Sequence, residues 1–156
     1  MSTVIGRAAP AFTAPSTDGE ISLKELKGRI VVMYFYPRDN TPGCTTEGQN
    51  FRDRYADFQA TGAQVLGVSR DTLASHQKFK EKQGFPFPLI ADPEEKLCEL
   101  YGVMKMKNMY GKQVRGIERS TFLIDAQGKL RQEWRGVKVP GHVDAVLEAV
   151  RALAKE

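Results

Sequence analysis

The stretch IVVMYFYPRDNTPGCTTE, residues 30–47, joins two elements of different periodicity. Its apolar part, residues 30–36, is rich in β-branched and aromatic side chains, which is typical of a strand buried on both faces. Thr41 fits the N-cap of a helix and Pro42 its first position, so Cys44 falls in the first helical turn. The segment therefore predicts a buried strand, a short loop and a helix that begins next to a cysteine.

Two more apolar runs predict buried strands, at residues 64–69 and 120–125. A turn follows the second run, so we expect that strand to continue as a hairpin into residues 130–134. Residues 1–27 contain two prolines and the turn sequence TDG, which predicts an irregular N-terminal β-hairpin.

Helical periods lie between these strands. Apolar side chains at positions 44, 51, 55 and 58 form one helical stripe, and residues 142–153 form an amphipathic C-terminal helix. A helix over residues 73–83 should end at Gly84, and DPEE at residues 92–95 predicts the N-cap and first turn of a short helix. Strands alternating with helices predict an α/β fold, with a central mixed sheet of about five strands and helices on both faces.

The composition bounds the kind of protein. A chain of 156 residues, 41% hydrophobic and 27% charged, suffices for one domain, residues 1–156, with its own core. Only 2 residues are Cys, which excludes a disulfide scaffold. No apolar run is long enough to span a bilayer and residues 1–12 lack a signal-peptide pattern, so we expect a cytoplasmic protein without a membrane partner. The net charge of +4 comes from basic residues interspersed with acidic ones, which disfavours a nucleic-acid partner.

Cys44 has the surroundings of a reactive residue. It follows the carboxyl end of a buried strand, where open α/β sheets bind their ligands. Unpaired backbone N–H groups and the positive end of the helix dipole favour the thiolate there. A thiolate that acts as a nucleophile also needs donors for the charge on the leaving group, which Thr41 and a fixed cation would supply. The alternative is a small, buried and inert cysteine that happens to start a helix.

Pro37, Thr41 and Cys44, spaced P-x-x-x-T-x-x-C, resemble the active-site motif of the peroxiredoxins. The longer run FYPRDNTPGCTTE is similar to the Q-type branch, also called bacterioferritin comigratory protein, and the resemblance extends over nearly the whole chain. It implies a thioredoxin-like fold. It also implies a thiol-dependent peroxidase that reduces hydrogen peroxide and organic hydroperoxides without a metal or any other cofactor.

The same resemblance implies roles for four residues. Cys44 would be the peroxidatic nucleophile, which the peroxide converts to a sulfenic acid. Thr41 would hydrogen-bond the peroxide, and Pro37 would shield the pocket from water. Arg119 would stabilise the thiolate and the breaking O–O bond.

Arg119 has a simpler interpretation if the resemblance is set aside. It directly precedes a predicted buried strand, where a cation needs a partner. An ion pair with Glu118 or Asp125 would supply that partner, and on the residues alone we would favour it.

The sequence departs from the Q-type branch in the cysteine that resolves the sulfenic acid. Many members carry it five residues after the nucleophile, where this chain has Gln49, and others carry it on the following helix, where residues 77–81 contain none. Cys98 lies at the edge of an apolar helix face, which indicates a packing role. We therefore predict a one-Cys cycle in which an external thiol (thioredoxin, glutaredoxin or glutathione) reduces Cys44. The alternative is an atypical two-Cys cycle with Cys98, which requires Cα atoms within about 7 Å.

Other functions have weaker support in the sequence. A peroxide-sensing redox switch or interaction protein would use the oxidation of Cys44 as a signal. A thiol-disulfide oxidoreductase is disfavoured because Thr41 stands where a C-x-x-C motif has its first cysteine. His76 and His142 lack the spacing of a zinc site, so we expect no metal and place both on helix surfaces. Q-type members are often monomeric, so the resemblance also implies a monomer.

Overall fold

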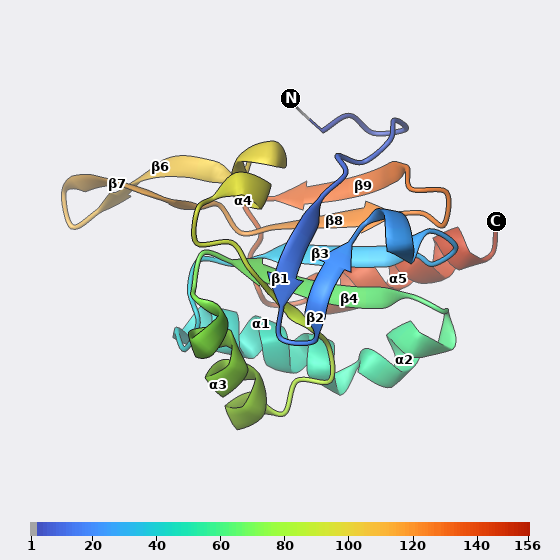
Figure 1. The fold of residues 1–156 in the computed structure, drawn as a ribbon, viewed down its shortest axis with the longest axis horizontal. Coiled ribbons are helices and arrows are strands. Elements are labelled where there is room, and N and C mark those ends of the chain that lie inside the picture. Colours follow the sequence, from blue (N-terminus) through green and yellow to red (C-terminus); the bar gives the residue numbers. More distant parts are fainter. Residues whose placement is uncertain (1–2) are drawn as a thin grey trace.

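The computed structural model describes residues 3–156, in which strands and helices alternate (Figure 1). The elements, in chain order, are β1 (Thr13–Ser16), β2 (Gly19–Ser22), the 3-10 helix η1 (Lys24–Leu26), β3 (Val31–Phe35), α1 (Pro42–Asp53), α2 (Tyr55–Ala60), β4 (Gln64–Ser69), α3 (Leu73–Gln83), β5 (Leu89–Ala91), α4 (Lys96–Leu100), β6 (Met104–Met109), β7 (Lys112–Ile117), β8 (Ser120–Ile124), β9 (Leu130–Arg135) and α5 (His142–Ala154). The predicted α/β fold with a central mixed sheet is confirmed.

The central sheet has seven strands in the order β2-β1-β5-β4-β3-β8-β9. Strand β3 lies inside it, parallel to β4 and antiparallel to β8, and all five of its residues are buried. The predicted N-terminal hairpin is the antiparallel pair β1–β2. It joins the main sheet where Ser16 lies opposite Ile90, so the sheet is larger than the predicted five strands. A contact between residues 74 positions apart leaves no local pattern in the sequence.

Helices cover both faces of the sheet, and alternate side chains of β3 therefore enter two different cores. Val32 and Tyr34 belong to one core, with apolar side chains of α1, α2, α3 and α5. Val31 and Met33 belong to the other, with side chains of α4 and the N-terminal segment. In Figure 1, α5 accordingly lies behind the sheet and α4 on the side of the viewer. Within residues 3–156, no helix has both the length and the apolarity needed to cross a membrane.

Two predicted helices have different bounds in the structure. The apolar stripe from position 44 to 58 is divided between α1 and α2, because Arg54 (φ −103°, ψ 5°) leaves the helical conformation. The helix predicted to start within DPEE begins only at Lys96, after Glu95 in the left-handed region (φ 63°). Asp92 still caps that helix, because its carboxylate accepts the N–H groups of Leu97 (3.0 Å) and Cys98 (2.8 Å).

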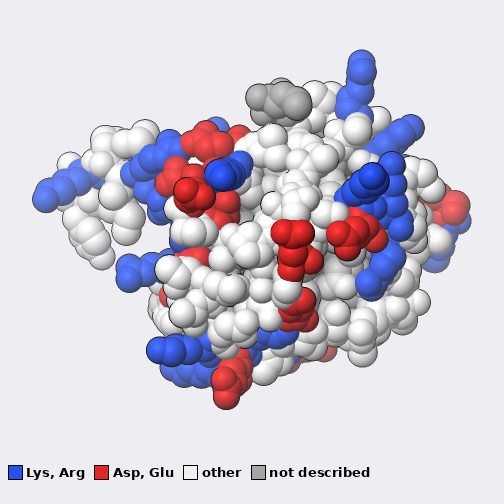
Figure 2. All heavy atoms as spheres, in the orientation of Figure 1, with Lys and Arg blue, Asp and Glu red and all other residues white. Residues whose placement is uncertain are grey.

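The hairpin β6–β7 was not predicted. It forms a separate two-stranded sheet that projects from the body of the protein (Figure 1). Met106 and Tyr110 are 61% and 99% exposed, so the hairpin lacks the alternation of buried and exposed residues that marks a strand. Figure 2 shows basic side chains on this hairpin next to acidic ones, and Arg115 pairs there with Glu95 of the segment before α4. The hairpin ends two residues before Arg119.

Candidate active site

The loop between β3 and α1 brings the predicted motif to the start of a helix. Pro37 is half-buried at the beginning of this loop, and Thr41 (φ −88°, ψ 151°) is the N-cap of α1. Pro42 is the first helical residue, so Cys44 is the third, as predicted, and it is 2% exposed. The Thr41 hydroxyl does not cap the helix but donates to the carbonyl of Arg38 at 2.8 Å. Its oxygen can therefore accept a hydrogen bond from a substrate O–H group.

Arg119 reaches the cysteine from the strand next to β3. It directly precedes β8, which pairs antiparallel with β3 so that Ser120 lies opposite Phe35, at the end of β3. Its Nη2 lies 3.5 Å from Cys44 Sγ. A Cβ on Gly43 would lie 3.1 Å from this Nη2, so a glycine at position 43 leaves room for the guanidinium group beside the first helical turn. The structure thus brings Cys44, Thr41 and Arg119 together at one end of α1.

Glu47 is a residue of this site that the sequence analysis missed. Its side chain is fully buried, one turn after Cys44 on α1, and its Oε1 accepts from Arg119 Nη1 at 2.6 Å. The ion pairs of Arg119 with Glu118 or Asp125 that the sequence suggested are not formed, and Asp125 pairs with Arg131 at 3.3 Å. The spacing of three residues from Cys44, on one face of a helix, is the signal that would have indicated Glu47.

Burial and the neighbouring charges together determine the pKa values of Glu47 and Arg119. Burial raises the pKa of Glu47 to about 7, and the neighbouring Arg119 offsets only part of this effect. The second oxygen of Glu47, Oε2, has no hydrogen-bond partner among residues 3–156, which agrees with a carboxyl group that holds its proton more tightly than usual. Burial alone would lower the pKa of Arg119, but Glu47 and Cys44 raise it, so the guanidinium group stays charged.

Cys98 lies on the other side of the sheet from Cys44. Both cysteines are free and buried, but Cys44 belongs to the core under α1 and α5, and Cys98 to the core under α4. Burial, together with the nearby Asp92, raises the pKa of Cys98 far above the usual range of a thiol. In this conformation Cys98 is packed within the core under α4, and its raised pKa favours the neutral thiol.

The prediction that both histidines lie on helix surfaces is wrong, because His76 is 0% and His142 6% exposed. His142 Nε2 lies 2.8 Å from the hydroxyl oxygen of Thr121. Burial and the nearby charge of Arg119 lower the pKa of His142 to about 4, so it is neutral near pH 7. His76 is part of a buried hydrogen-bond network with acidic residues.

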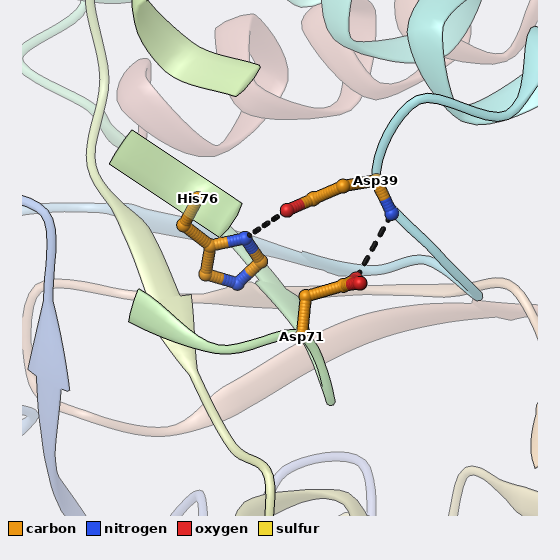
Figure 3. A group of neighbouring side chains, drawn as sticks. All are labelled: Asp39, Asp71 and His76. Atoms are coloured by element: carbon orange, nitrogen blue, oxygen red, sulfur yellow. Dashed lines mark hydrogen bonds and ion pairs between the residues drawn. The ribbon is translucent and has the colours of Figure 1, made fainter. Parts of the chain in front are cut away.

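That network contains three groups whose ligand atoms lie within 4.8 Å of one another, on Asp39, Asp71 and His76 (Figure 3). Each atom already has a partner. His76 Nδ1 lies 2.7 Å from Asp39 Oδ2, and its Nε2 lies 2.9 Å from the carbonyl oxygen of Ile90. Asp71 Oδ2 accepts the backbone N–H of Asp39 at 2.9 Å. A metal ion would have to displace these hydrogen bonds, so the donor set does not resemble an open metal site.

Known proteins resemble this chain over nearly its full length. Residues 5–133 match the model of the AhpC/TSA family. Peroxiredoxin Bcp of Xanthomonas campestris is 55% identical, over 98% of each chain, and Peroxiredoxin Bcp of Bacillus subtilis is 46% identical over 100% of each. Among solved structures, Peroxiredoxin Q of X. campestris has a TM-score of 0.87 at 52% identity, covering 92% of this chain and 91% of the other.

Fold and sequence together define a peroxiredoxin, a thiol peroxidase with a thioredoxin-like fold that reduces a peroxide with electrons from a thiol. The predicted class and fold are thus confirmed. The chain belongs to the AhpC/TSA family, in which its relatives form the peroxiredoxin Q, or bacterioferritin comigratory protein, branch.

Proposed function

We propose that Cys44 is the nucleophile that reduces hydrogen peroxide and organic hydroperoxides. The observation that carries this proposal is the distance of 3.5 Å between Cys44 Sγ and Arg119 Nη2, at the N-terminus of a helix. A fixed guanidinium group and the helix dipole both stabilise a thiolate at that position. One solved relative is named for the alkyl peroxide reduction activity of the X. campestris protein, which supports organic hydroperoxides as substrates here.

In the proposed reaction, the Cys44 thiolate attacks one oxygen of the peroxide, an S–O bond forms and the O–O bond breaks. The sulfur is oxidised by two electrons to a sulfenic acid, and the leaving oxygen takes up a proton to give water or an alcohol. Arg119 stabilises the negative charge that develops on the oxygens, and Thr41 accepts a hydrogen bond from the peroxide O–H. Pro37, at the beginning of the same loop, limits the access of water.

We further propose that an external thiol resolves the sulfenic acid. Cys98 lies in the opposite core and Gln49 occupies a position where other Q-type chains carry a resolving cysteine. A Cys44–Cys98 disulfide would require both cysteines to leave their cores. Thioredoxin, glutaredoxin and glutathione are the candidate reductants. From the resemblance to the Q-type branch and from the composition of the sequence, we also propose a cytoplasmic monomer in which residues 1–156 act as one domain.

Replacing Cys98 by serine tests the one-Cys cycle. Cys98→Ser is expected to keep at least half of the wild-type peroxide turnover with dithiothreitol, because Cys98 takes no part in the chemistry. Cys44→Ser, the matched control, is expected to lose turnover completely. Peroxide consumption over many turnovers measures both variants and distinguishes an enzyme from a sensor, which would react about once per molecule. A collapse of turnover in Cys98→Ser would exclude the one-Cys cycle.

Excess peroxide without a reductant provides a second test. Since no thiol lies near Cys44 to trap the sulfenic acid, it is expected to be oxidised further to the sulfinic and sulfonic acids. Intact-mass spectrometry should then show a gain of two or three oxygen atoms on wild-type protein and no such gain on Cys44→Ser. A loss of two hydrogen atoms would instead reveal an internal disulfide and contradict the proposal.

A further inference from the structure

A buried network of hydrogen bonds lies behind the loop that carries the proposed site. Its centre is Asp39, whose side chain is 1% exposed and takes part in three hydrogen bonds. Asp39 Oδ1 accepts from the hydroxyl of Tyr36 (2.6 Å), and Oδ2 accepts from the hydroxyl of Ser75 (2.8 Å) and lies 2.7 Å from His76 Nδ1. Figure 3 shows His76 and Asp71 on the same side of Asp39. None of these residues belongs to the motif of Pro37, Thr41, Cys44 and Arg119.

The hydrogen bonds of this network are buried. The carbonyl oxygen of Ile90 can only accept, so His76 Nε2 donates to it. His76 Nδ1 and Asp39 Oδ2 share a second hydrogen bond, and the two side chains are 0% and 1% exposed. Such a pair is costly to break, because the group left behind is a buried polar group without a partner.

The network connects the loop before α1 to the start of α3. Asp39 lies two residues before Thr41, the N-cap of α1, whereas Ser75 and His76 lie in the first turns of α3. The backbone of Asp39 is fixed as well, because its N–H group donates to Asp71 Oδ2 at 2.9 Å. The main chain of Asp39 is therefore bonded to the segment that joins β4 and α3, and its side chain is bonded to α3 itself.

The hydrogen bonds of Asp39 to α3 affect the two half-reactions, the attack of Cys44 on peroxide and the reduction of its sulfenic acid by a thiol, in opposite ways. A small peroxide reacts with Cys44 in the closed conformation, where Arg119 lies beside the sulfur and Thr41 is the N-cap of the same helix. An external thiol is larger and must approach the sulfur of a side chain that is 2% exposed. The first turn of α1 and the loop before it must therefore open before the thiol can attack. Any contact that holds Asp39 in place opposes this opening.

We propose that Asp39 and His76 are positioning residues that hold the active-site loop closed and thereby set the balance between peroxide attack and thiol resolution. The proposal rests on Cys44 as the nucleophile. The pair acts on the equilibrium between the closed and the open loop, and it contacts neither the peroxide nor the thiol.

The expected size of the effect follows from that equilibrium. If the closed form dominates, weakening the pair can raise the open fraction about tenfold while the closed fraction hardly changes. Thiol resolution should then become about tenfold faster, whereas peroxide attack should slow by less than about twofold. General loss of stability does not produce this asymmetry.

Asp39→Asn tests the proposal, because it keeps the shape of the side chain and replaces the carboxyl group that bonds Ser75 and His76 by an amide. In steady-state kinetics with hydrogen peroxide and dithiothreitol, kcat/KM for dithiothreitol should rise about tenfold and kcat/KM for peroxide should stay within about twofold. The peroxide concentration that inactivates half of the enzyme by over-oxidation should rise as well. The matched control is Gln77→Ala, on the same helix, whose side chain bonds the N-terminal hairpin at the carbonyl of Thr17. It should change neither constant.

Equal changes in both constants, or none, would overturn the proposal. If Asp39→Asn does not fold, Ser75→Ala removes a single donor to Asp39 and should shift the two constants in the same directions by a smaller factor. Failure of the proposed function would look different, because wild-type Cys44 would then form no sulfenic acid that dimedone can trap. Trapping with dimedone is therefore carried out first.

Discussion

Arg119→Ala is expected to lower the second-order rate constant for hydrogen peroxide by roughly 100- to 1,000-fold. The reason is that Nη2 of Arg119 lies 3.5 Å from Cys44 Sγ, where it can stabilise both the thiolate and the oxygens of the breaking bond. Loss of one preorganised donor from such a site costs about 3 kcal/mol of transition-state stabilisation. Stopped-flow measurement of sulfenic acid formation under pseudo-first-order conditions gives the rate constant directly.

Two further variants separate the charge of Arg119 from its geometry. Arg119→Lys keeps a cation but cannot bond Glu47 and Cys44 through two nitrogens at once, so its rate constant should lie between those of wild type and Arg119→Ala. Arg131→Ala removes an arginine that pairs with Asp125 and Glu156 away from the site, and should have no effect on the rate. A decrease of less than threefold in Arg119→Ala would show that this arginine does not act on the transition state.

Glu47→Ala is expected to lower the same rate constant by about 10- to 100-fold. Glu47 does not contact the sulfur, but its Oε1 holds Arg119 Nη1 at 2.6 Å and so fixes the direction of the guanidinium group. An arginine displaced by about 1 Å loses much of its effect on a reacting centre. Glu47→Gln retains an acceptor of the same shape and should recover most of the rate. If Glu47→Ala reacts at the wild-type rate, Arg119 is positioned without Glu47.

The raised pKa of Glu47 makes the free energy of unfolding depend on pH, and Glu47→Gln should abolish this contribution. The Glu47 pKa of about 7 in the folded protein lies above the usual glutamate value of 4.5, so the folded protein binds more protons than the unfolded chain between these two pH values. The free energy of unfolding should therefore decrease as the pH rises from about 4.5 to 7 and level off above it, by up to about 3 kcal/mol in total. Denaturant unfolding at pH 5 and pH 8 measures this difference. An identical pH dependence in wild type and Glu47→Gln would contradict a raised pKa at Glu47.

Local patterns predicted the elements that local interactions determine. Strand β3 follows from one continuous apolar run, and α3 has the predicted bounds because Gly84 adopts the left-handed conformation (φ 66°) that ends the helix. The position of Cys44 in the first turn of α1 follows from Thr41 and Pro42 in the same way. In each case the determining residues lie within a few positions of one another.

Features that depend on distant partners were missed or wrong. Glu47 has one local signal, its spacing of three residues from Cys44, but its partner Arg119 lies 72 residues later and no local pattern connects the two. His76 is buried against Asp39, which lies 37 residues earlier in the chain. The residues near His76 in the sequence do not reveal this contact, so the prediction of an exposed helix surface was wrong. The hairpin β6–β7 packs as a separate ribbon and has exposed apolar side chains, so its sequence shows no strand periodicity. Tertiary contacts, not local propensity, determine these features.

The burial of Cys98 makes the unaltered chain convenient for spectroscopy. A maleimide fluorophore or a nitroxide added to the folded protein would attach at one position, since the only other sulfhydryl is enclosed under α4. Cys44 is itself almost covered, so the speed of attachment would report how often the beginning of α1 unwinds. The labelling rate of Cys44 thus measures the opening of the helix that carries it, and no engineered cysteine is needed.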